Sequence, residues 1–148
     1  MLEQIKTQLS QSINLQSKTG VFFSAFDANG MLLASNWVIK TDRPLETILQ
    51  SFYNWIIKKI EEQVKSIIFD IVEEVRLQQD PNVIKKVPLD QYGLFLVEWN
   101  GQNSWVLLPN TKWATQIQDA LWAIRKKYNL NNQVSVFVFK TKKIPISL

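Results

Sequence analysis

Residues 21–39 read VFFSAFDANGMLLASNWVI, and this stretch decides the fold. Residues 21–26 are rich in valine and phenylalanine, as are strands that pack against a core. Asn29-Gly30 follows, and Asn-Gly between apolar runs is a strong hairpin signal because both residues tolerate positive φ. The stretch therefore predicts two antiparallel strands, 21–26 and 31–39, joined by a tight two-residue turn.

A second pair of apolar runs repeats this arrangement later in the chain. Residues 92–99 and 104–108 flank Asn100-Gly101, and Pro109 ends the second run. The same reasoning predicts a second antiparallel hairpin across this Asn-Gly pair.

Two single strands complete the predicted sheet. Residues 66–76 are apolar at alternate positions and also carry apolar residues between them, which is typical of a central strand covered on both sides. Residues 134–139 form the last strand, followed by a basic tail. Residues 78–90, with two prolines, are expected to be a loop or a short irregular segment.

Apolar residues at helical spacing predict three helices. The first runs from Leu2 to near Ser17-Lys18, and the third from Asn110 or Thr111 to Tyr128. The second begins after Thr41 or Asp42, either of which can cap it, with Pro44 in its first turn. Together these elements predict an α+β fold, a mostly antiparallel or mixed sheet with two Asn-Gly hairpins, packed by three helices. We expect one domain over residues 1–148.

The same spacing predicts which side chains form the core. These residues are Leu49, Phe52, Ile56, Ile67, Phe69, Ile71, Leu121 and Ile124.

Composition limits the classes of function. The 148 residues are 46% hydrophobic and 20% charged, with a formal net charge of +4, as in an ordinary globular protein. The chain has no histidine and no cysteine, which excludes disulfides and thiolate or imidazole metal sites, so we expect no metal and no cofactor. No apolar run reaches the roughly 20 residues of a membrane span. We therefore expect a cytoplasmic protein without a membrane partner.

Acid–base or nucleophilic catalysis would fall to few groups. Asp70, Glu73 and Glu74 lie on the predicted central strand, where a buried carboxylate that lines a cleft could act as an acid or base. We instead expect Asp70 to lie at a solvent-facing edge or to pair with a lysine. Ser35 lacks a base at a recognised motif spacing, with Lys40 and Lys65 the nearest candidates. We therefore name no catalytic residue.

Basic clusters and tryptophans offer two further functions. The clusters are Lys58-Lys59, Lys85-Lys86, Arg125-Lys126-Lys127 and the lysines at 140, 142 and 143. With Trp37, Trp99 and Trp105 they could bind RNA or DNA, but we favour solvated charge because glutamates dilute the positive field. Trp55 and Trp122 fall off the apolar stripes of their helices, where each is either an interface anchor or a cover at the core edge.

The order of these landmarks resembles the AMMECR-type domain family. Gly20-Val21-Phe22-Phe23, Pro44-Leu45, Gly93-Leu94 and Leu107-Leu108-Pro109 match the family's motifs, over roughly residues 1 to 143. Where the family has R-G-C-I-G, this chain has Leu33-Ala34-Ser35-Asn36-Trp37, so the resemblance is to a degenerate member. Relatives in the family occur beside a radical-SAM partner, which implies a modification pathway.

The resemblance also implies a ligand cleft between the first hairpin and the segment after Pro109. Ser35 and Trp37 should face the cleft together because residues two apart share one side of a strand. Asn110 and Trp113 should close it from a helix N-terminus, whose N–H groups favour an anion or carbonyl. Alternatively, Trp37 fills the cleft and leaves no ligand site.

We therefore expect a non-catalytic binding or accessory module that engages a protein partner or a small polar ligand. The alternatives are an enzyme of the modification pathway and, third, a nucleic-acid-binding protein.

Overall fold

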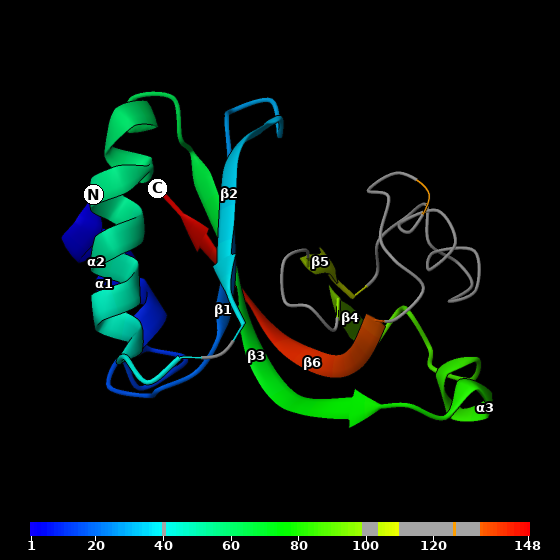
Figure 1. Ribbon diagram of the computed structural model, residues 1–148. Helices are drawn as coiled ribbons and strands as arrows, with labels where there is room; N and C mark the ends of the chain where they lie inside the picture. Colours follow the sequence, from blue (N-terminus) through cyan, green and yellow to red (C-terminus); the bar gives the residue numbers. More distant parts are fainter. Residues whose placement is uncertain (40, 99–103, 110–125, 127–133) are drawn as a thin grey trace. The chain divides into compact units, whose positions relative to one another are not determined.

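The computed structural model describes residues 1–39, 41–98, 104–109, 126 and 134–148 (Figure 1). Within these residues the helices are α1 Leu2–Ser10, α2 Leu45–Trp55, the short 3-10 helix η1 Ile57–Ile60 and α3 Pro81–Ile84. The strands are β1 Val21–Phe26, β2 Leu32–Val38, β3 Ser66–Gln78, β4 Gly93–Glu98, β5 Ser104–Leu107 and β6 Val134–Ser147. The strands form one sheet in the order β2-β1-β3-β6-β4-β5. The predicted α+β fold with an antiparallel sheet packed by three helices is confirmed.

The contacts within the chain divide it into two compact units. The first unit is Met1–Glu73 with Lys142–Leu148, and the second is Glu74–Thr141. Strands β3 and β6 each contribute residues to both units. The single domain expected from the sequence stays a prediction.

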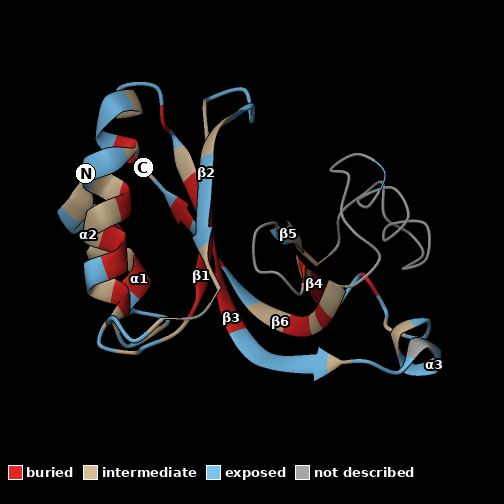
Figure 2. Ribbon diagram, viewed as in Figure 1, coloured by how far each residue is buried: buried red, intermediate tan, exposed pale blue. Residues whose placement is uncertain are grey.

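In the first unit, α1 and α2 cover one face of β1, β2 and β3 (Figure 1). β1 pairs antiparallel with both neighbours, and Phe23 lies opposite Phe69. The Phe23 ring lies 4.8 Å from the ring of Phe52 and 6.4 Å from that of Phe69, measured between centroids. Ile144 and Ile146 of β6 belong to the same core. The buried side of α2 faces the strands in Figure 2.

Most of the predicted core is confirmed. The buried residues among those predicted are Leu49, Phe52, Ile67, Phe69 and Ile71. Ile56 is only partly buried, although it packs against this core. α2 ends at Trp55, the backbone of Ile56 is not helical (φ −126°), and the next residue, Ile57, is fully buried. Leu121 and Ile124 lie outside the described residues.

The first hairpin is confirmed, but its turn differs from the predicted one. Asp27 pairs with Met31 through a backbone hydrogen bond, and the Gly30 N–H donates to the Asp27 carbonyl. Gly30 has a φ of 78°, whereas Asn29 is not among the described positive-φ residues. This is a three-residue loop with glycine in the left-handed position. The Asp27 carboxylate fixes it by accepting hydrogen bonds from the N–H groups of Asn29 and Met31.

Two predicted helix boundaries were wrong. α1 ends at Ser10 rather than near Ser17-Lys18, and α2 has Pro44 at its N-cap position without a side-chain cap. The carbonyl groups of Leu15 and Ser17 accept hydrogen bonds from the first two N–H groups of α2. These two carbonyl groups therefore take the capping role assigned to Thr41 or Asp42.

In the second unit, β4 pairs antiparallel with β5 and with β6. The second hairpin is thus confirmed in its strands, whereas Asn100-Gly101 lies outside the described residues. Gly93 lies opposite Phe139, and a Cβ at this position would overlap the buried Phe139 ring. A small core gathers around these strands, formed by Leu89, Leu94, Leu96, Leu107, Val136 and Val138.

Two segments of the chain are more regular than predicted. α3 forms one helical turn where a loop or irregular segment was expected. β6 continues to Ser147, so the predicted basic tail is part of a strand. The predicted helix from Asn110 or Thr111 to Tyr128 falls almost entirely on residues that the structure does not describe.

Candidate functional site

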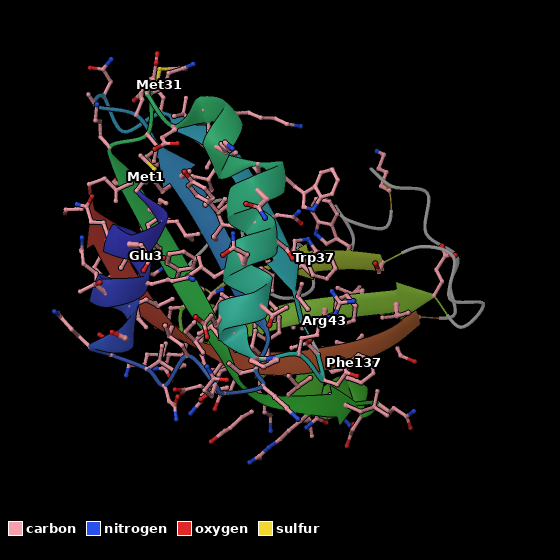
Figure 3. All side chains as sticks on the ribbon, turned by 90° about the vertical axis from the view of Figure 1, so that its left-hand side faces the viewer. Met1, Glu3, Met31, Trp37, Arg43 and Phe137 are labelled. Atoms are coloured by element: carbon pink, nitrogen blue, oxygen red, sulfur yellow. The ribbon has the colours of Figure 1, made fainter. Side chains whose placement is uncertain are left out.

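Ser35 and Trp37 lie on β2, at the edge of the sheet, and both are exposed. Ser35 pairs with Ser24, and Trp37 pairs with Phe22 of β1. The Trp37 ring stacks on Phe22 with 6.0 Å between centroids and 27° between planes. The two residues thus share a face of β2, as their spacing requires. Figure 3 shows Trp37 well removed from Met31 at the hairpin tip.

The other half of the predicted cleft lies outside the described residues, because neither Asn110 nor Trp113 is described. The cleft itself, and the alternative in which Trp37 fills it, therefore stay predictions. Trp99 and Trp122 are likewise outside the described residues, whereas Trp55 is 73% exposed, as its position off the apolar stripe indicated.

Asp70 is buried rather than at a solvent-facing edge, and it pairs with a lysine as the second alternative predicted. Its Oδ1 lies 3.0 Å from Lys143 Nζ, while only 4% of its side chain is exposed. The Lys143 side chain is 58% exposed, so this is an ion pair between a buried carboxylate and a solvent-accessible ammonium group.

A pocket of about 350 Å³ lies within the second unit. The end of β3 provides one part of its lining, with Glu74, Arg76 and Gln78. This part of β3 is exposed, unlike its first half (Figure 2). The volume falls at the lower end of the range for small-molecule sites, roughly 300–1,000 Å³.

The rest of the described lining comes from three further segments. The loop around α3 contributes Asn82, Val83, Lys86, Val87 and Pro88, and β6 contributes Val138, while Tyr92 precedes β4. The described lining thus combines five apolar or aromatic residues with five polar or charged ones. Ligand pockets likewise combine apolar surface with polar groups that orient the ligand.

Hydrogen bonds within the loop fix this lining. Asp80 Oδ1 accepts a hydrogen bond from the Asn82 N–H at 2.9 Å, and the Asp80 carbonyl accepts from the next two N–H groups. The Pro88 carbonyl accepts from the N–H of Tyr92. Ile84, Val87 and Tyr92 pack against the core of the second unit, so the loop is anchored at both ends.

Three charged side chains line the pocket. Arg76 and Glu74 form an ion pair with 3.8 Å between guanidinium nitrogen and carboxylate oxygen, and both are largely exposed. The ion pairs of the described residues leave Lys86 without an acidic partner. Lys140 Nζ lies 5.0 Å from the centre of the Tyr92 ring, within reach of a cation–π contact.

This pocket was not predicted from the sequence. Lys85-Lys86 was expected to be a solvated basic cluster, and residues 78–90 a loop or a short irregular segment. The alternation of Glu74, Arg76 and Gln78 with Val75 and Leu77 was the available signal, because it shows a strand continuing beyond residue 76 with one polar face.

Two features are absent from the part of the chain that the structure describes. They contain no cluster of three or more acidic, histidine or cysteine residues able to hold a metal ion. None of the helices in the described part combines the length and apolarity needed to cross a membrane.

Comparison with known proteins identifies a similar fold. No protein-family model and no curated protein matches the chain. Among solved structures, the crystal structure of uncharacterized protein PH0010 from Pyrococcus horikoshii is similar, with a TM-score of 0.71 and 16% sequence identity. The similarity covers 96% of this chain and 85% of that chain, and at this identity it concerns the fold alone.

Proposed function

We propose that the chain is a non-catalytic binding module that holds a small molecule in the pocket of the second unit. The observation that carries this proposal is the pocket itself, about 350 Å³ and lined by apolar or aromatic residues together with polar and charged ones. The proposal changes the location of the ligand from the predicted cleft at Ser35 and Trp37 to residues of β3, α3 and β6.

We further propose that the chain is a degenerate AMMECR-like domain and that it is cytoplasmic. The ordered landmarks, from Gly20-Val21 to Leu107-Leu108-Pro109, support the family, and the absence of cysteine fits the compartment. A radical-SAM enzyme encoded beside this gene would support the family, whereas unrelated neighbours in every genome that carries the gene would count against it.

Filling the pocket tests the small-molecule function. The probe is N-phenyl-1-naphthylamine, an uncharged aromatic amine that fluoresces in apolar sites. Val83→Trp places an indole in the pocket lining, and we expect it to weaken probe binding by about ten-fold or more. Val75→Trp is the matched control, because Val75 is similarly exposed (43% against 42%) but does not line the pocket.

Circular dichroism establishes that both variants fold before the titrations are compared. A wild-type protein that binds no probe, or equal losses in the two tryptophan variants, would overturn the proposed function.

Trp55 favours a protein partner as a second candidate. Its side chain is 73% exposed at the end of α2, and exposed tryptophans are frequent interface anchors. A photo-crosslinking residue at position 55 should capture a defined partner in cells, whereas the same residue at the neighbouring exposed position 58 should not. Identical products from both positions would argue against this surface.

A further inference from the structure

We propose that the pocket of the second unit selects an organic monoanion, a carboxylate or sulfonate group joined to an apolar body. This inference rests on the proposed small-molecule function and adds the chemical class of the ligand. It is drawn from the charges of the lining and from the position of its apolar side chains.

The described charged groups of the lining leave one unbalanced positive charge. Glu74 and Arg76 neutralise each other as an ion pair, whereas Lys86 has no acidic partner among the described residues. A ligand with one negative charge would neutralise the ammonium group of Lys86. Because Lys86 is exposed, this group need not be fully desolvated when the ligand binds.

The apolar lining gives the body of the ligand its surface. Val83 is 42% exposed and Val138 only 7%, so these two side chains extend from the rim to the buried part of the pocket. Val87 and Tyr92 lie between exposed and buried. The Tyr92 ring carries Lys140 near one face, a further positive charge beside the lining. An aliphatic or aromatic body is therefore expected to contact these side chains while its anionic group meets Lys86.

A change at Glu74 gives a second test, in which binding of an anion should become stronger instead of weaker. The Glu74 carboxylate lies 3.8 Å from the Arg76 guanidinium and competes with any anionic ligand for that cation. Removing the charge of Glu74 should therefore strengthen binding of an anion, whereas removing the charge of Lys86 should weaken it. A site that recognises only apolar bodies would show neither effect.

Two probes with nearly the same aromatic body separate charge from apolar contact. 8-Anilinonaphthalene-1-sulfonate carries one negative charge, and N-phenyl-1-naphthylamine is its uncharged counterpart. We expect the wild-type protein to bind the sulfonate more tightly, and Lys86→Gln to weaken sulfonate binding by about two- to five-fold, as for an exposed ion pair. Glu74→Gln should strengthen it by a similar factor, and neither variant should alter binding of the uncharged amine.

Lys85→Gln is the matched control, since Lys85 neighbours Lys86, is equally exposed and does not line the pocket. Equal binding of the two probes to the wild-type protein, or equal effects of Lys85→Gln and Lys86→Gln, would overturn the anion preference. In that case binding of the uncharged amine, sensitive to Val83→Trp, would still support the proposed function. Failure of both probes would instead remove the proposed function itself.

Discussion

Tyr53 and Glu61 show how one hydrogen bond gives the first unit a pH dependence. The Tyr53 hydroxyl donates to Glu61 Oε2 at 2.9 Å, and this hydrogen bond raises the pKa of the phenol above its ordinary value. Burial and the negative charge of Glu61 raise the pKa further. Because the folded-state pKa lies above the unfolded value of about 10, the contribution to stability is complete below that pH and is lost above it.

We therefore expect the free energy of unfolding to fall more steeply above about pH 10 in the wild type than in Tyr53→Phe. Urea titrations from neutral to alkaline pH measure both proteins, and Glu61→Gln should flatten the profile in the same way. Parallel curves for the wild type and Tyr53→Phe would show that the hydrogen bond does not control the alkaline loss.

At the scale of elements, the β1–β2 loop depends on the left-handed backbone of Gly30. No atom outside the neighbouring residues lies within 4 Å of a Cβ placed there, so a substitution meets backbone strain without a steric clash. Gly30→Ala should lower the free energy of unfolding by roughly 1–2 kcal/mol, and Gly30→Asn by less, because asparagine tolerates positive φ. Chemical denaturation measures both, and an alanine variant as stable as the asparagine variant would contradict the role of this φ.

The elements also show what the sequence could predict. Alternation identified Ile67, Phe69 and Ile71 as one buried face, and Asn29-Gly30 located the first hairpin, because both signals are local. The predicted cap of α2 was wrong because the groups that accept from Leu45 and Glu46, the carbonyls of Ser17 and Leu15, are distant in sequence. The pocket was missed for the same reason, since Arg76, Lys86 and Val138 come from three separate segments.

For the whole molecule, the sharing of β3 and β6 between the two units predicts a single unfolding transition. β3 and β6 run through both units, so unfolding of one unit disrupts strands that the other unit also uses. Phe69→Ala in the first unit should cost roughly 3–5 kcal/mol and Leu96→Ala in the second roughly 2–5 kcal/mol. Each should shift the urea midpoint equally when followed by tryptophan fluorescence or by circular dichroism. Two separate steps, each moved by only one variant, would show independent domains.

The placement of Lys142–Leu148 in the first unit has a consequence for biosynthesis. Ile144 and Ile146 complete the core around Phe69, Lys143 balances the buried Asp70, and the Leu148 N–H donates to the Lys65 carbonyl. A ribosome adds roughly 5–20 residues per second, so translating the intervening Glu74–Thr141 takes on the order of several seconds. Throughout that interval the nascent residues 1–73 lack the side chains of Ile144 and Ile146 that complete their core. The first unit to be translated is therefore the last that can finish folding, and nascent-chain binding by chaperones should fall only once residues 142–148 have emerged.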